Sequence, residues 1–118
     1  MITQKIGLFG ETAAAKYLEY KGYEILDRNY RLKCGELDII AKDEETMVFV
    51  EVKTRKSDEY GAAAEFVDYK KQQRIRRTAV SYAASDSVDM RFDIVEVYYT
   101  IEDNKAVLKR INHIKDAF

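Results

Sequence analysis

The chain has 118 residues, with 20 basic and 21 acidic side chains, and 47% of its residues are hydrophobic. This composition excludes a disordered protein and predicts one globular domain over residues 1–118. The balanced charge means that composition alone does not indicate a nucleic-acid-binding protein. The sequence predicts no bilayer-crossing segment and no signal peptide, and its single cysteine, Cys34, excludes an internal disulfide. We therefore expect a cytoplasmic protein with no membrane partner.

A first helix is predicted over residues 3–21, with Gly22 as its C-terminal stop. Its apolar residues recur at steps of three and four: Ile6, Phe9, Ala13, Tyr17 and Tyr20. Gly7 and Gly10 lie about one turn apart and weaken the helix by about 1 kcal/mol each. Such glycines indicate that a strand or a ligand approaches this face closely. Glu11 lies near the same face, although spacing alone favours an ordinary exposed glutamate.

A short strand over residues 23–31 leads into a predicted β-hairpin. Its arms are residues 37–41 and 47–54, and residues 42–46 form the turn. Both arms are rich in Val, Ile, Leu and Phe, which is typical of buried strands. Each arm nevertheless carries charged side chains, and a buried charge is costly unless it is paired, neutralised or bound to a metal.

The register of this hairpin brings the charged residues together. Side chains alternate along a strand, so Glu51 and Lys53 share a face with Phe49. The opposite face is uniformly apolar on both arms: Leu37, Ile39 and Ala41 on the first, and Val48, Val50 and Val52 on the second. If these faces align, Ile40 lies opposite Phe49 and Asp38 opposite Glu51, with Cβ atoms ~4.5–5.5 Å apart. Carboxylates at that spacing repel each other unless a cation lies between them, and Mg²⁺ prefers such oxygens. Charges that alternate with apolar residues are also common on solvated faces, so the pattern leaves both interpretations open.

A loop around Gly61 is predicted over residues 57–64, followed by a second helix from residue 64 or 65 to residue 85. The apolar side of this helix includes Val67, Ile75, Ala79, Tyr82 and Ala83. The same helix carries the densest basic cluster of the chain. Eight basic residues could border one groove: Lys53, Arg55, Lys56, Lys70, Lys71, Arg74, Arg76 and Arg77. A segregated basic groove is compatible with phosphate-backbone binding, but a solvated helix face is the commoner explanation of such a run.

Residues 90–100 are apolar on both faces and predict an interior strand. A turn then leads to an antiparallel edge strand over residues 106–112, and the tail is expected to dock through Ile114 and Phe118. His113 has no second His or Cys set up to share a metal with it, and it is interpreted as a structural or surface residue. The order α-β-β-β-α-β-β predicts an α/β fold, with a mixed sheet flanked by helices.

Several motifs follow one another along nearly the whole chain. They are G-x-x-G-E (7–11), G-Y-x-I-L-x-R-N-Y-R (22–31), G-E-L-D-I-I (35–40), V-F-V-E-V-K-T-R (48–55), Y-G (60–61), K-K-Q (70–72) and R-F-D-I-V (91–95). With these motifs the chain resembles the YraN-type family of the restriction-endonuclease-like PD-(D/E)xK nuclease superfamily. The resemblance implies an α-β-β-β-α-β core. Leu37 stands where the superfamily's name places proline, and the Q-x-x-x-Y signature of some relatives is absent.

The resemblance also implies roles for individual residues. One Mg²⁺ or Mn²⁺ would be held by Asp38, Glu51 and the main-chain carbonyl of Val52, and Glu11 would complete the shell or hold a second ion. Lys53 would orient or deprotonate the attacking water. The expected catalytic residues are therefore Asp38, Glu51, Lys53 and Glu11. The residues expected to contact nucleic acid are Arg55, Lys70, Lys71, Gln72, Arg74 and Arg77.

The function implied by this resemblance is a metal-dependent endonuclease acting on DNA, selective for branched or flapped shapes because none of these contacts reads bases. A nucleic-acid-binding module without catalysis and a protein-interaction domain are the alternatives. A homodimer is a further expectation, because 118 residues offer little surface for two strands.

Overall fold

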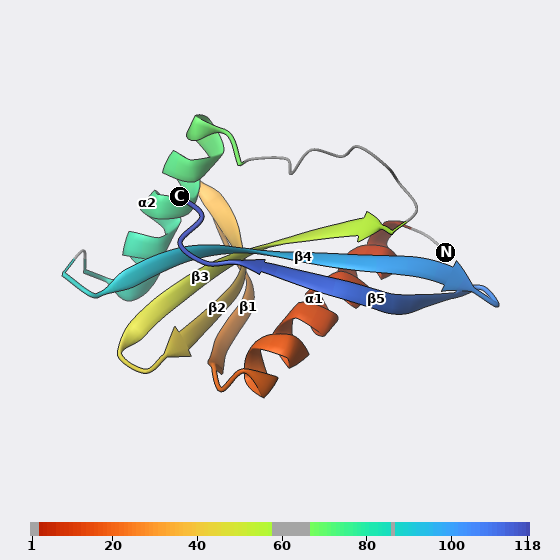
Figure 1. The fold of residues 1–118 in the computed structure, drawn as a ribbon. Helices are drawn as coiled ribbons and strands as arrows, with labels where there is room; N and C mark the ends of the chain where they lie inside the picture. Colours follow the sequence, from red (N-terminus) through yellow and green to blue (C-terminus); the bar gives the residue numbers. More distant parts are fainter. Residues whose placement is uncertain (1–2, 58–66, 86) are drawn as a thin grey trace.

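The computed structural model describes residues 3–57, 67–85 and 87–118. Within these residues, two helices and five strands follow one another in the order α-β-β-β-α-β-β (Figure 1). Their bounds are α1 Thr3–Tyr20, β1 Glu24–Leu32, β2 Gly35–Asp43, β3 Thr46–Lys56, α2 Tyr69–Ala83, β4 Met90–Glu102 and β5 Lys105–Ile114. This order confirms the predicted α/β fold and matches the core that the resemblance implies. Within the described residues, neither helix is long and apolar enough to cross a membrane.

The strands form one sheet in the order β1-β2-β3-β4-β5. Only β3 and β4 run parallel, while the other neighbours are antiparallel. The interior position of β4 and the edge position of β5 confirm the predictions for these two strands. Figure 1 shows α1 on one face of the sheet and α2 on the other.

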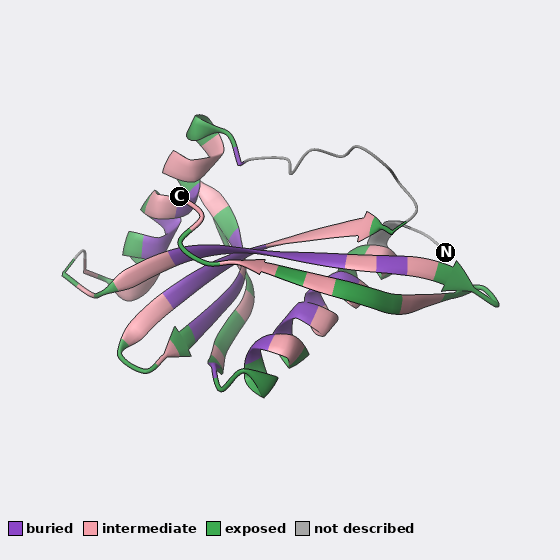
Figure 2. Ribbon diagram, viewed as in Figure 1, coloured by how far each residue is buried: buried purple, intermediate pink, exposed green. Residues whose placement is uncertain are grey.

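Each helix covers its own hydrophobic cluster, and Figure 2 shows the buried residues concentrated along the central strands. The buried residues of the α1 cluster are Ala14, Ala15, Leu18, Tyr23, Ile39, Ala41, Val48, Val50, Val95 and Val97. Those of the α2 cluster are Leu37, Ile40, Phe49, Val67, Ile75, Ala79, Phe92 and Ile94. Alternation along β3 therefore sends valines to α1 and Phe49 to α2, as the sequence pattern predicts.

The close approach predicted from the two helix glycines occurs at Gly10. A Cβ atom there would lie 1.9 Å from Oγ1 of Thr54 on β3, so α1 can pack this closely only with glycine. A Cβ atom at Gly7 would meet nothing within 4 Å. The apolar assignment of Tyr20 is wrong, because this last residue of the helix is 87% exposed. Gly22 then ends the helix with φ of 94°, a conformation that side-chain-bearing residues rarely adopt.

The second helix begins later than predicted. Asp68 is its N-cap, and the side chain accepts a hydrogen bond from Lys71 N at 2.8 Å. Val67 and Asp68 are not helical. The predicted start at residues 64–65, and most of the predicted loop around Gly61, lie outside the described residues.

The C-terminal tail is fastened to β4 by a buried carboxylate. Asp93 is fully buried and binds the Arg91 guanidinium through both oxygens, at 2.9 and 3.0 Å. The same carboxylate lies 2.7 Å from His113 Nε2 and accepts a hydrogen bond from Asp116 N at 3.0 Å. His113 therefore holds a structural position. The predicted docking of the tail is confirmed, because Phe118 stacks on an aromatic ring of β4 and Ile114 joins the α2 cluster.

The predicted pair Ile40–Phe49 is confirmed, but Asp38 and Glu51, predicted to lie opposite each other, do not form a pair in the ladder. Leu37 is an exception, since it packs in the α2 cluster with Ile40 rather than sharing a face with Ile39. The β2–β3 ladder extends no further than Ile39, and Leu37 pairs with Tyr30 of β1 instead. The pair Asn29–Asp38 is missing from the β1–β2 ladder, and Asn29 has φ of 55°, so a local irregularity at this point interrupts the alternation of a regular strand.

Candidate functional site

The candidate site lies where β2 and β3 separate, at a fork that we define by Asp38, Glu51 and Val52. The β2–β3 ladder ends at the pair Ile39–Val50. Just beyond it, Oδ2 of Asp38 accepts a hydrogen bond from the backbone N–H of Val52 at 2.8 Å. Because the ladder has ended, the N–H of Val52 has no backbone acceptor in β2, and the Asp38 carboxylate accepts its hydrogen bond instead. This contact holds Asp38 close to Glu51.

Glu51 projects from the fork toward α2, where two ammonium groups face it. Nζ of Lys71 lies 2.6 Å from Oε1 of Glu51, and Nζ of Lys53 lies 3.8 Å from the same oxygen. The Glu51 side chain is only 10% exposed. Burial lowers the pKa of Lys71, but its hydrogen bond to Glu51 and the charges of Glu51 and Asp38 outweigh burial and raise it. Lys71 therefore stays protonated and neutralises Glu51.

Asp38 has the most perturbed carboxyl group of the fork. Its pKa is raised from 3.8 to about 7, mainly by burial and then by the nearby charge of Glu51, against the opposing effect of the hydrogen bond from Val52. Glu11 adds a smaller effect in the same direction. A carboxyl group that titrates near neutral pH beside a second carboxylate is an arrangement found at functional sites.

Glu11 reaches the fork from α1 but is held by β1. Its Oε1 accepts hydrogen bonds from Arg28 Nε at 2.9 Å and from Asn29 Nδ2 at 2.8 Å. Glu11, Asn29, Asp38 and Val52 all line one cavity of about 360 Å³ between α1 and the sheet. The structure therefore brings the first-helix acid to the cavity that Asp38 borders, with one of its oxygens already occupied.

A divalent ion, as the resemblance implies, would find a limited set of donors at the fork. Within the described residues, no three His, Cys, Asp or Glu side chains gather closely enough to form a metal site. Mg²⁺, however, usually retains several waters and binds through one or two carboxylates. The repulsion between Asp38 and Glu51 is the kind that such a cation relieves. These two side chains, with a main-chain carbonyl and water, fit a hard cation.

The predicted nucleic-acid-binding residues separate into two groups. Arg55 points inward, where its Nε lies 3.3 Å from Glu96 and its side chain is 12% exposed. Lys71 faces Glu51, and the Gln72 amide donates to the carbonyl of Val67 at 2.8 Å. The others line an outer cavity on α2: Lys70, Arg74 and Arg77, together with Tyr69 and Gln73. The eight basic residues therefore do not border a single groove.

Arg28 and Asn29 are site residues that the sequence interpretation does not identify. Asn29 has φ of 55°, a left-handed conformation that Asn tolerates better than most residues, and it lines the cavity beside Asp38. The R-N-Y-R motif includes both residues, but nothing in its spacing indicates a contact with α1. Only the fold reveals that they orient Glu11.

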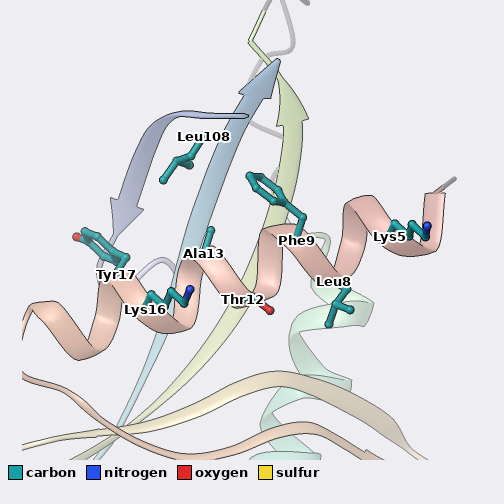
Figure 3. Close-up of a pocket in the computed structure, with 8 residues that line it drawn as sticks. All are labelled: Lys5, Leu8, Phe9, Thr12, Ala13, Lys16, Tyr17 and Leu108. Carbon is teal, nitrogen blue, oxygen red and sulfur yellow. The ribbon is translucent and has the colours of Figure 1, made fainter. Parts of the chain in front are cut away.

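Another cavity lies away from these carboxylates. It has a volume of about 520 Å³ and runs between α1 and β5 (Figure 3). Its lining is mainly apolar and includes Phe9, Ala13 and Leu108, with Lys5 and Lys16 among the described residues around it. No acidic side chain is among these described lining residues, so they provide no carboxylate ligand for a metal ion.

Comparisons with known proteins agree with the motifs. The model of Uncharacterised protein family UPF0102 matches residues 10–97, which include the whole fork. A UPF0102 protein of Alkaliphilus oremlandii is 46% identical and covers 99% of this chain and 100% of the relative. A UPF0102 protein of Caldanaerobacter subterraneus subsp. tengcongensis is 47% identical over 96% of this chain and 93% of the relative. One of Clostridioides difficile is 44% identical over 100% of both chains. The chain therefore belongs to the UPF0102 family, the YraN-type family that its motifs indicate.

Proposed function

We propose that this protein is a metal-dependent endonuclease that hydrolyses phosphodiester bonds in DNA and selects branched or flapped shapes. The observation that carries the proposal is the pairing of Asp38 and Glu51 at the fork, where burial and mutual repulsion raise the pKa of Asp38 to about 7. A structural role alone gives no reason to keep two carboxylates in this costly arrangement.

The proposed ligands of Mg²⁺ or Mn²⁺ are Asp38, Glu51 and the main-chain carbonyl of Val52. Glu11 borders the cavity that Asp38 and Val52 line. Such an ion, when bound, lowers the pKa of a water molecule and neutralises charge on the phosphate. The protein's own contribution begins with Asp38, which the N–H of Val52 holds in one orientation at 2.8 Å. Preorganised ligands of this kind reduce the cost of reaching the transition state.

The two lysines at the fork are suited to different tasks. Lys71 carries a raised pKa and remains an ammonium, so it can stabilise negative charge but cannot act as a base near neutral pH. Lys53, 3.8 Å from Glu51, is less tightly engaged and is the residue proposed to orient the attacking water. If Glu51 served as a metal ligand, the Lys71 ammonium that now pairs with it would be available to a phosphate oxygen.

A nucleic-acid-binding module without catalysis is the second candidate. One observation favours it: Glu51 already faces two ammonium groups, and Glu11 is bound by Arg28 and Asn29. In this case the charges of the fork would be satisfied within the protein, and a divalent ion would have no net advantage.

The deciding experiment is cleavage of a labelled panel that contains a single strand, a duplex, a flap and a four-way junction, with Mg²⁺ or Mn²⁺. Wild-type protein is compared with Asp38→Asn, Lys53→Ala and the control Asp103→Asn, which changes an exposed carboxylate in the turn between β4 and β5. We expect cleavage of a branched or flapped substrate by wild type and by the control, and none by the other two variants. Circular dichroism should show all variants folded.

Thermal unfolding measures cation binding independently of DNA cleavage. Selective binding of the cation to the folded state should raise the Tm of wild type and not that of Asp38→Asn. Shape-dependent binding without cleavage, and without any effect of cations on Tm, would favour the binding module instead.

A further inference from the structure

Tyr69, at the start of α2, exposes an aromatic ring among basic side chains. The residue is 73% exposed and lines a cavity of about 250 Å³. The described residues that share this cavity are Lys70, Gln73, Arg74 and Arg77, and none of them is acidic. The surface thus combines a solvent-facing π-system with three cationic groups and one amide.

This combination suits an unpaired nucleotide. A base stacks on an aromatic ring through its flat face, while Lys and Arg neutralise the adjoining phosphates. In a duplex both faces of an internal base are already stacked on its neighbours, so the ring would find no partner there. Stacking also requires no particular base, because every base has a π-face.

The cavity beside Tyr69 lies on the same helix as Lys71, which contacts the fork, and this relates the unpaired nucleotide to the cleavage site. Lys71, two residues after Tyr69, contacts Glu51 at the fork. Successive residues of an α-helix project about 100° apart, so Tyr69 and Lys71 point to different sides of the same helical turn. The unpaired base that Tyr69 would stack therefore lies on the other side of the first turn of α2 from the fork.

We propose that Tyr69 is a stacking platform for an unpaired base, and that Lys70, Arg74 and Arg77 hold the phosphates of the same single-stranded segment. The assignment rests on the proposed function for its substrate class, and it defines that substrate as DNA with a single-stranded arm next to the cleaved bond. The structure supplies a matched control in Tyr20, an 87% exposed tyrosine outside this cavity.

The test is fluorescence-anisotropy binding without divalent cations, so that affinity is measured apart from cleavage. The probes are a single-stranded DNA, an abasic strand of equal length, a duplex, and an RNA of the same sequence. The proteins are wild type, Tyr69→Ala, Tyr69→Phe, Tyr20→Ala and Arg74→Ala, each measured over a range of salt concentrations. Tyr69 is exposed, so its variants are expected to fold, and equal Tm values would verify this.

Tyr69→Ala should bind the single strand about 5- to 150-fold more weakly than wild type, the usual range for loss of one stacked base. Tyr69→Phe and Tyr20→Ala should bind as wild type does. Arg74→Ala should lower the salt dependence by about 0.7 per lost phosphate contact, whereas Tyr69→Ala should leave it unchanged. The abasic strand should not distinguish Tyr69→Ala from wild type. Equal affinity for single-stranded DNA and RNA would show that Tyr69 stacks the bases of both nucleic acids. A higher affinity for DNA would match the proposed substrate.

Unchanged single-strand affinity in Tyr69→Ala, an equal loss on the duplex, or no binding of nucleic acid by wild type would overturn the inference. The two proposals fail separately. Stacking on Tyr69 without cleavage by wild type would refute the nuclease and leave the platform. Cleavage that Asp38→Asn abolishes, together with unchanged binding by Tyr69→Ala, would refute only the platform.

Discussion

Replacing Asp38 by Asn is expected to stabilise the cation-free protein at and above neutral pH. Burial, followed by the charge of Glu51, raises the pKa of this carboxyl from 3.8 to about 7. An amide has nearly the same shape, and its oxygen can still accept the hydrogen bond from Val52. The substitution therefore removes an unfavourable buried charge and keeps the contact that orients the side chain.

The magnitude follows from the displaced pKa of Asp38. A change from 3.8 to about 7 corresponds to about 4 kcal/mol between the charged and neutral forms. Because the folded-state pKa lies above the unfolded one, the folded protein retains a proton that the unfolded chain releases over this interval. The carboxylate thus costs no stability below about pH 4, and its full cost applies above about pH 7. At about 4 °C for each kcal/mol, Asp38→Asn should raise the Tm by up to about 15 °C.

Thermal unfolding in the presence of a chelator, from about pH 4 to about pH 8, measures this effect. Asp103→Asn is the matched control, since this aspartate lies exposed in the turn between β4 and β5. The Tm difference between Asp38→Asn and wild type should grow with pH, whereas the control should show no such growth. A pH-independent difference, or an Asp38→Asn protein that is less stable than wild type near pH 8, would refute the reasoning.

Two further predictions concern packing and the buried carboxylate. Gly10→Ala should lower the free energy of unfolding by about 1–3 kcal/mol, because its Cβ would lie 1.9 Å from Thr54 Oγ1. Gly7→Ala, in open space, should raise it by up to about 1 kcal/mol in urea unfolding, and equal effects would contradict the close approach. Asp93→Asn should cost about 3–5 kcal/mol in the same assay, because it breaks the buried ion pair with Arg91, whose guanidinium keeps only the more exposed Asp43 as a carboxylate partner. Glu102→Gln, in an exposed ion pair, should change little, and a similarly small loss at Asp93 would show that the buried network is not stabilising.

The central strands can be predicted from the sequence because their apolar pattern is long and regular. Residues 90–100 are apolar on both faces, and β4 is an interior strand. The pair Ile40–Phe49 follows from uniform apolar faces on both arms of the hairpin, since a shift of one residue would turn every side chain to the wrong face. Local patterning therefore determines this part of the sheet.

The fork could not be predicted in the same way. Alternation assumes a regular strand, and it fails at Leu37 because the pair Asn29–Asp38, just before Ile39, is missing from the β1–β2 ladder. Tyr20 continues the apolar spacing of α1, but it is the last residue of the helix and is 87% exposed. The periodicity of the sequence predicts which way a side chain points. What that side chain contacts depends on where helices and strands end, and the periodicity does not show this.

The basic residues show how this limit affects function. The sequence assigns eight cations to one groove, but Lys71 lies 2.6 Å from Glu51 and Arg55 lies 3.3 Å from Glu96. Both are neutralised by carboxylates, and Arg55 is almost completely buried. Affinity for nucleic acid requires cations that still hold counterions to release. In this fold the clearest ones are the three on the outer face of α2, namely Lys70, Arg74 and Arg77. The proposed phosphate-binding surface is therefore smaller than the basic run suggests, and in this proposal a stacked base provides correspondingly more of the affinity.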